Sequence, residues 1–260
     1  MRILALDTSG RAASAAVAEG GRLLARFWLV HGRTHAEALM PCVEAALGGL
    51  CLEASDIGAF AAVVGPGSFT GLRVGVSCAK AMAFAVGAQT IAVPALDALA
   101  RSLLPPGGRC LGEPGSCLLA CPMTDARNRQ VYAAAYRATA VGGGDQSLSM
   151  LPAMPAAAIA VETLAVRLAA LAEGIRAEKG IQVAVVFNGD AAEKYFGEMR
   201  AALPCDALLA DELCMLPDAA SAALVACGMA ARGEFTPPAE LAPLYLRVPQ
   251  AERLRGEMKP

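Results

Sequence analysis

The segment AAVVGPGSFTGLRVGVSCAKAMAFAVG, Ala61–Gly87, joins an apolar run to a helical pattern through a glycine-containing turn. A turn of this kind often holds a phosphate, because backbone N–H groups are open at the helix N-terminus. The standard nucleotide motifs do not fit, since no lysine follows a suitable glycine pair and Thr70 stands where the dinucleotide motif needs glycine. Pro66 likewise stands where a nucleophile elbow needs glycine. Motif chemistry alone therefore favours a structural turn.

The helix predicted at Leu72–Val86 carries a stripe of small residues on one face. The stripe repeats at intervals of four: Gly71, Gly75, Ala79 and Ala83. A glycine inside a helix costs about 0.8–1 kcal/mol relative to alanine, so Gly75 should have a packing role. The stripe can pack on the chain's own sheet or on the helix of a partner, because small residues let another element come close.

The segments around this helix predict a mixed sheet. Three apolar runs, the last two joined by the hairpin signal Gly20-Gly21, predict antiparallel strands: Arg2–Leu6, Ala12–Ala18 and Arg22–Val30. Thr34 and Glu37 form a capping box before a helix that reaches Leu47 and ends at Gly48-Gly49. Strand, helix, strand and helix follow: Ala59–Val64, Leu72–Val86, Thr90–Val93 and Pro94–Leu104.

The second half of the chain loosely repeats this order of elements. Its strands are predicted at Cys117–Cys121, Gln130–Tyr136, Ser147–Leu151 (after the turn Gly142–Asp145) and Gln182–Phe187, and its helices at Val161–Glu173, Ala191–Met199 and Asp218–Arg232. The predicted division is an N-terminal lobe at 1–104, a Pro- and Gly-rich hinge at 105–116, a C-terminal lobe at 117–217 and an extended tail at 234–260, with helix 218–233 packing back on the first lobe. Two α/β lobes, each a mixed sheet flanked by helices, are the architecture of the actin, hexokinase and heat-shock ATPase superfamily.

Composition and charge exclude several function classes. Hydrophobic residues make up 56% of the 260 residues and aromatic residues only 5%, so alanine-rich helices should pack closely. The net charge of -2 and the pI of about 5.8 argue against strong nucleic-acid binding by this chain alone, because that needs clustered Lys and Arg. No membrane span is expected, since Arg73 and Lys80 interrupt the most apolar helix, and a cytoplasmic location is expected.

The cysteines and histidines predict no metal site. The nine cysteines form no CxxC pair, so they are interpreted as small buried residues in a reducing compartment. His31 and His35 have the spacing of a zinc motif, but Gly32 stands where that motif needs glutamate.

Six stretches together resemble the TsaB (YeaZ) family, the non-catalytic relatives of the threonylcarbamoyl transferase TsaD. They are ILALDTSG (Ile3–Gly10), THAEALMP (Thr34–Pro41), VGPGSFTGLRVGVSCAKAMA (Val64–Ala83), DARNRQVYAA (Asp125–Ala134), NGDAAEKY (Asn188–Tyr195) and PLYLR (Pro243–Arg247). The resemblance is close over the first hundred residues and weak from Val141 to Val186. Older labels for this family are glycoprotease-like and peptidase M22-like.

The resemblance implies a scaffold or activator subunit in the synthesis of threonylcarbamoyladenosine beside the tRNA anticodon. It implies docking on a TsaD-type transferase as a heterodimer, association with a TsaE-type ATPase, contact with tRNA only through the complex, and a homodimer in isolation. No cofactor is expected on this chain alone, and ATP or ADP is expected at the complex interface. The register of the transferase's metal-binding histidines falls here on Ala95 and Leu99, which cannot bind a metal.

The resemblance also singles out two groups of site residues. Two N-lobe helices should pack side by side and offer an apolar face to a partner, through His35, Leu39, Val43, Leu47, Leu72, Gly75, Val76, Ala79 and Ala83. Possible nucleotide- or phosphate-facing turns contain Asp7, Thr8, Ser9, Gly65, Gly67, Ser68, Thr70, Gly71 and Arg73. An autonomous ATPase or sugar kinase of the same fold, using Asp7 and Asp125, is the alternative, although the turn Met123–Asn128 lacks the glycines of a second phosphate loop. A metallopeptidase is a third possibility, and it would require bound metal.

Overall fold

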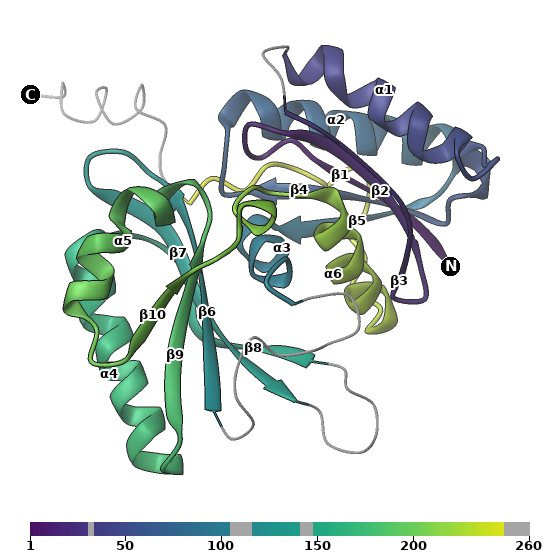
Figure 1. Ribbon diagram of the computed structural model, residues 1–260. Coiled ribbons are helices and arrows are strands. Elements are labelled where there is room, and N and C mark those ends of the chain that lie inside the picture. Colours follow the sequence, from purple (N-terminus) through teal and green to yellow (C-terminus); the bar gives the residue numbers. More distant parts are fainter. Residues whose placement is uncertain (31–33, 105–115, 141–147, 247–260) are drawn as a thin grey trace, which may run out of the picture.

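Two five-stranded sheets, one in each lobe, form the frame of the molecule (Figure 1). The computed structural model describes residues 1–30, 34–104, 116–140 and 148–246. His31, the turn Gly142–Asp145, the end of the tail and all but the last residue of the predicted hinge lie outside the described residues.

The N-lobe sheet has the strand order β3-β2-β1-β4-β5. Its strands are β1 (Arg2–Asp7), β2 (Ala13–Glu19), β3 (Arg22–Leu29), β4 (Ala59–Gly65) and β5 (Gln89–Pro94). The first three are antiparallel, as the hairpin signal predicted, and β4 and β5 run parallel to β1. Helices α1 (His35–Gly48) and α2 (Phe69–Val86) cover one face, and α3 (Ala95–Arg101) and α6 (Ala219–Ala231) cover the other (Figure 1).

The C-lobe sheet repeats this topology with the order β10-β9-β6-β7-β8. Its strands are β6 (Ser116–Asp125), β7 (Gln130–Ala140), β8 (Leu148–Ala160), β9 (Gln182–Asn188) and β10 (Asp206–Leu209). Helices α4 (Val161–Lys179) and α5 (Asp190–Ala202) pack on one face, while α3 reaches across from the N-lobe to the other (Figure 1). The predicted two-lobed α/β fold with mixed sheets is confirmed.

Several elements differ from the sequence expectation, among them β8, β10 and α2. β8 continues through Pro152 and Pro155 to Ala160, because it is an edge strand and its prolines remove no hydrogen bond from a second neighbour. The short strand β10 was not predicted. Helix α2 begins at Phe69 rather than Leu72, because the Ser68 hydroxyl accepts a hydrogen bond from the Gly71 N–H and caps the helix earlier.

Helix α2 is long and apolar enough to cross a membrane by length and composition, which the sequence had not led us to expect. Its buried side chains, Leu72, Val76, Ala79 and Ala83, pack within the N-lobe, so we interpret it as a core helix.

A C-terminal strap, Thr236–Tyr245, returns from α6 across the N-lobe. Thr236 pairs with Thr90 at the edge of β5, and Leu241 is buried in the core beneath α1 and α2. The Lys80 ammonium donates to the carbonyls of Ala239 and Leu241, so α2 holds the middle of the strap.

Candidate functional site

The glycine turn of Ala61–Gly87 binds the chain's own first turn. The Ser68 N–H donates to the Ser9 carbonyl at 2.7 Å, and the Thr8 hydroxyl donates to the Gly71 carbonyl at 2.7 Å. A Cβ at Gly67 would lie 2.5 Å from the Ser9 carbonyl oxygen, and a Cβ at Gly71 would overlap the Thr8 carbonyl oxygen. Glycine is therefore needed at both positions so that two backbone turns can touch.

This packing uses two of the backbone N–H groups of the turn, and the phosphate-facing interpretation of the turn stays a prediction. A phosphate loop needs free backbone N–H groups, whereas those of Ser68 and Gly71 already have acceptors within the chain. Gly65 has a φ of 128°, and a Cβ there would lie 2.6 Å from the Leu244 carbonyl oxygen, so the strap covers this residue. Thr70 and Arg73 are the exposed side chains of this group.

Asp7, at the end of β1, lies inside the N-lobe and is only 1% exposed. Its Oδ1 accepts from the Ser9 N–H at 2.8 Å and the Ser9 hydroxyl at 2.7 Å, whereas its Oδ2 has no partner. Burial raises the pKa of Asp7 to about 6; the Ser9 hydrogen bonds and His35 lower the pKa, and the Asp218 carboxylate raises it. This carboxyl group is a buried structural group rather than one open to a substrate.

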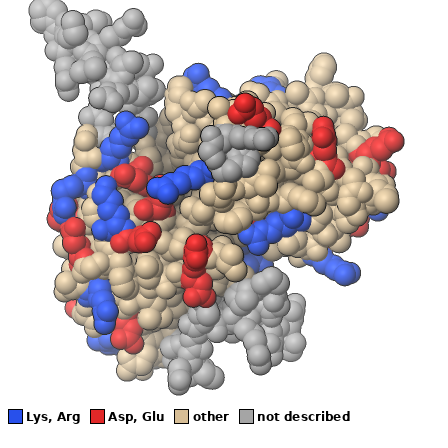
Figure 2. All heavy atoms as spheres, turned by 45° about the horizontal axis from the view of Figure 1, so that its top comes forward, with Lys and Arg blue, Asp and Glu red and all other residues tan. Residues whose placement is uncertain are grey.

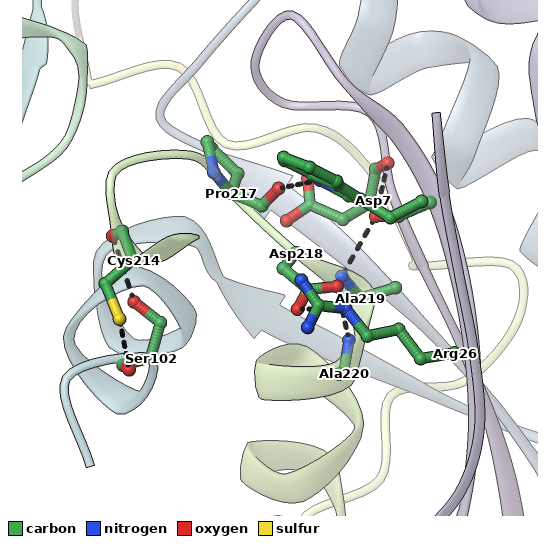
Figure 3. A network of polar contacts seen from close by, with 10 residues as sticks. Asp7, Arg26, Ser102, Cys214, Pro217, Asp218, Ala219 and Ala220 are labelled. Carbon is green, nitrogen blue, oxygen red and sulfur yellow. Dashed lines mark hydrogen bonds and ion pairs between the residues drawn. The ribbon is translucent and has the colours of Figure 1, made fainter. Parts of the chain in front are cut away.

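Below Asp7, a polar network fixes the start of α6 (Figure 3). Asp218 accepts from the Ala220 N–H at 3.0 Å, which caps the helix, and pairs with the Arg26 guanidinium at 3.0 Å. The Trp28 indole N–H donates to the Pro217 carbonyl at 3.2 Å. The sequence pattern predicted a helix from Asp218 but did not indicate this network. An Asp directly before an alanine-rich run is a signal for a helix cap, and it could have pointed to the role of Asp218.

A polar seam joins the two lobes through α3. The Tyr136 hydroxyl of β7 donates to the Asp97 carboxylate of α3 at 2.5 Å. Burial raises the pKa of Asp97, and this hydrogen bond lowers it. The Asn188 amide donates to the carbonyls of Leu99 and Cys214 at 2.7 and 3.0 Å. The Ser102 hydroxyl donates to the Cys214 carbonyl, and the Cys214 thiol donates to the Ser102 carbonyl (Figure 3).

The turn Asp125–Arg129, which corresponds in the C-lobe to the turn after Asp7, is held by its own polar contacts. Arg127, Asn128 and Arg129 have φ values of 62°, 52° and 55°, and the Asp125 carboxylate accepts from the Arg127 N–H at 2.8 Å. Asp125 also pairs with Lys194 at 3.6 Å. The two aspartates of the alternative kinase interpretation therefore differ, since Asp7 is buried and Asp125 is exposed.

The residues predicted to bind a partner lie largely inside this chain. The following are buried in the N-lobe: Leu39, Val43, Leu47, Leu72, Gly75, Val76, Ala79 and Ala83. His35 is half-buried, and its Nε2 lies 2.9 Å from the Gly10 carbonyl oxygen. A Cβ at Gly75 would lie 2.5 Å from the Thr8 hydroxyl oxygen, so the small-residue stripe serves the contact of α2 with its own lobe. The assignment of these side chains to an exposed face is thereby corrected.

Helices α1 and α2 do lie side by side, and their exposed side chains form a different, largely apolar face. We call it the α1–α2 face, and its exposed apolar residues are Met40, Pro41, Ala81, Phe84, Ala85 and Val86. Phe84 is 85% exposed. In Figure 2 charged side chains crowd the left-hand lobe and are sparse over the right-hand lobe, which carries these helices.

Comparison with known proteins identifies the family. Residues 30–234 match the family described as TsaD, tRNA N6-adenosine threonylcarbamoyltransferase. The chain belongs to this family.

Named relatives include proteins called TsaB and one called tRNA N6-adenosine threonylcarbamoyltransferase. The chain is 31% identical over 137 residues to the tRNA threonylcarbamoyladenosine biosynthesis protein TsaB of Bacillus subtilis, with 53% of this chain and 56% of that protein covered. It is 35% identical over 137 residues to the protein of the same name from Escherichia coli, with 53% and 55% covered. The match thus spans about half the length of these curated relatives. The structure of YeaZ from Pseudomonas aeruginosa has a TM-score of 0.72 at 28% identity and covers 94% of this chain and 99% of its own.

Within the TsaD family, the positions that the resemblance assigns to metal-binding histidines are apolar here. Ala95 and Leu99 are 4% and 1% exposed, and Ala95 packs in the N-lobe core with α6. Among the residues that the structure describes, no group of three or more His, Cys, Asp or Glu side chains could hold a metal ion.

Proposed function

We propose that this chain is a non-catalytic subunit in the synthesis of threonylcarbamoyladenosine on tRNA, and that it docks on a TsaD-type transferase. The relatives named TsaB support the pathway. The observation that carries the non-catalytic part is the packing of the glycine turn on Thr8 and Ser9, in which the Ser68 N–H, a group that a phosphate loop would use, is bonded to the chain itself.

The α1–α2 face supports docking on a protein partner. Its exposed residues are largely apolar, with Glu37 and Glu44 of α1 and Arg73 of α2 as the exposed charges, and apolar patches on soluble proteins usually mark interaction sites. Two equivalent helices of the transferase would complete a four-helix bundle with α1 and α2. In the absence of the transferase, a second copy of this chain would cover the same face, giving a homodimer.

Further parts of the proposal concern the complex. A TsaE-type ATPase joins the two subunits, ATP or ADP binds at the complex interface, and tRNA is held by the complex rather than by this acidic chain. All of these steps take place in the cytoplasm.

Substitution of Phe84 tests the docking. Since Phe84 is 85% exposed, Phe84→Glu should leave the fold intact but lower the affinity for the transferase of the same organism by at least about tenfold, as the loss of an aromatic anchor from an interface does. Val166 of α4 is 70% exposed on the corresponding C-lobe helix pair, so Val166→Glu is the matched control and should bind like the wild type. Isothermal titration calorimetry measures both. Unchanged binding by Phe84→Glu would exclude the α1–α2 face.

An activity measurement tests the non-catalytic part. The transferase, the ATPase and tRNA should form the modified nucleoside efficiently only when this chain is added, while the pure chain should show no sustained ATP turnover. Turnover by the pure chain that disappears in Asp7→Ala would establish the autonomous ATPase instead.

A further inference from the structure

Arg73, in the second turn of α2, is held in place by two aromatic rings at one end of the α1–α2 face. Its guanidinium carbon lies 4.1 Å from the centroid of the Phe69 ring, and its Nε donates to the Tyr245 hydroxyl at 3.2 Å. The rings of Phe69 and Tyr245 are stacked, with centroids 5.0 Å apart. We call these three residues the Arg73 cluster.

The cluster joins two distant parts of the chain at the surface. Phe69 and Arg73 belong to α2, and Tyr245 ends the C-terminal strap, which is fixed by the bond from the Leu244 N–H to the Val64 carbonyl. Phe69 is 45% exposed and Tyr245 is 39% exposed, so the rings support the guanidinium without covering it. The long arginine side chain is therefore ordered before any partner arrives, which lowers the entropy lost on binding.

The charge of Arg73 is not neutralised within the described ranges 1–30, 34–104, 116–140 and 148–246, where no carboxylate forms an ion pair with it. Helix α2 contains no Asp or Glu, and its other cation, Lys80, is engaged by the carbonyls of the strap. The Phe69 ring packs against one face of the guanidinium, and the Tyr245 hydroxyl accepts the hydrogen bond from Nε. The two Nη nitrogens therefore remain as a pair of donors, a donor fork.

We propose that the Arg73 cluster binds a carboxylate side chain of the partner that docks on the α1–α2 face, an inference that rests on the proposed function. A carboxylate matches the donor fork with two parallel hydrogen bonds, which lysine cannot provide. A protein carboxylate suits the site better than an RNA phosphate, because Arg73 stands beside an apolar face on an acidic chain and no other free cation lies on α2. The bond orients the partner along α2, while the apolar face supplies contact area.

Four variants and two salt concentrations test this proposal by calorimetry with the transferase of the same organism. Arg73→Ala should weaken binding by about ten- to a hundredfold, and Arg73→Lys should recover little of that loss because it lacks the fork. Tyr245→Phe keeps the stacked ring and should have a smaller effect. Arg167→Ala removes an exposed arginine from α4 and is the control, with unchanged affinity. The wild-type affinity should fall with added salt more steeply than that of Arg73→Ala.

A charge exchange gives the strictest result. Arg73→Glu should abolish binding, and replacement of one acidic residue of the transferase by arginine should restore it. If Arg73→Ala binds within twofold of the wild type while Phe84→Glu is weakened, Arg73 only tethers the strap and this inference is wrong, although docking stands. If the wild type does not bind the transferase, both proposals fail. Loss of tRNA binding by isolated Arg73→Ala would assign the cluster to RNA instead.

Discussion

The two lobes have the same strand order but present different helical surfaces. The α1–α2 pair of the N-lobe and the α4–α5 pair of the C-lobe follow corresponding strands and cover corresponding faces (Figure 1). The α1–α2 pair carries few charges: Glu37, Glu44, Arg73 and Lys80. The α4–α5 pair carries many: Glu162, Arg167, Glu173, Arg176, Glu178, Lys179, Asp190, Glu193, Lys194, Glu198 and Arg200.

The same strand topology thus carries two helical surfaces of different character, one highly charged and one largely apolar. On the C-lobe, Arg129 bridges Glu162 of α4 and Glu198 of α5, so an arginine at that surface is neutralised within the chain. On the N-lobe, Arg73 lacks such a bridge among the described residues and stands beside exposed apolar side chains. The N-lobe, with its exposed apolar side chains and, in the described part of the chain, the unpaired Arg73, is therefore the lobe expected to bind a partner.

Glycine substitutions should give the largest contrast between the lobes. Gly71→Ala forces a Cβ onto the Thr8 carbonyl oxygen, and backbone cannot move away cheaply, so the free energy of unfolding should fall by about 3 kcal/mol or more. A Cβ added at Gly197 of α5 would meet no other group within 4 Å, so Gly197→Ala should raise the free energy of unfolding by about 0.5–1 kcal/mol. Urea unfolding measures both. Equal changes in the free energy of unfolding for the two variants would show that the contact of α2 with Thr8 does not require glycine at position 71.

The paired strand-end aspartates should differ in their pH dependence. The pKa of Asp7 is raised to about 6, because burial favours its neutral form. The contribution of neutral Asp7 to the free energy of unfolding is therefore complete below about pH 4 and is lost as the pH rises through about 6. Asp7→Asn should remove this loss and be more stable than the wild type by about 2–3 kcal/mol at pH 8. Exposed Asp125 provides the control, and Asp125→Asn should change stability by less than about 0.5 kcal/mol. A pH-independent difference between Asp7→Asn and the wild type would contradict the assignment.

The polar seam between the lobes should contribute less to the free energy of unfolding than the Gly71 contact or Asp7. Tyr136→Phe leaves the half-buried Asp97 carboxylate without its donor, so the free energy of unfolding should fall by about 1–2 kcal/mol. Tyr132 is on the same strand, and Tyr132→Phe should have an effect below about 0.5 kcal/mol. Two separate unfolding transitions in Tyr136→Phe, against one in the wild type, would show that this bond couples the lobes. No change in stability would rule the bond out as a link.

Local signals predicted the fold well because they act over a few residues. The hairpin at Gly20-Gly21 and the capping box of Thr34 and Glu37 both form as expected. β10 was not predicted because a four-residue strand has almost no sequence pattern of its own. The predicted end of β8 at Leu151 was too early, because a strand tolerates prolines at a sheet edge and that position is a tertiary property.

The candidate site was harder to predict for a similar reason. Intervals of four in Gly71–Ala83 show which residues share a helix face, but not whether that face meets the chain's own sheet or a partner. The partners of Arg26 and Tyr136 lie far away in the sequence, at Asp218 and Asp97, so no local pattern could pair them. The apolar character of the α1–α2 pair was visible in the sequence, whereas its exposed residues were not.

The strap and α6 place part of the N-lobe core at the far end of the chain. The cores on the two faces of that lobe include Leu241 and residues of α6 between Ala219 and Ala226. Among the described residues, the C-lobe core below α4 and α5 is built from residues between Cys117 and Met215. During translation the N-lobe is therefore begun first and completed last. Helix α2 lacks Leu241 beneath it and Tyr245 beside Arg73 until those residues have been synthesised, after the whole C-lobe. The proposed docking face takes its final form only after the strap, Thr236–Tyr245, has been made, so a partner that recognises this face would select against chains that end before the strap.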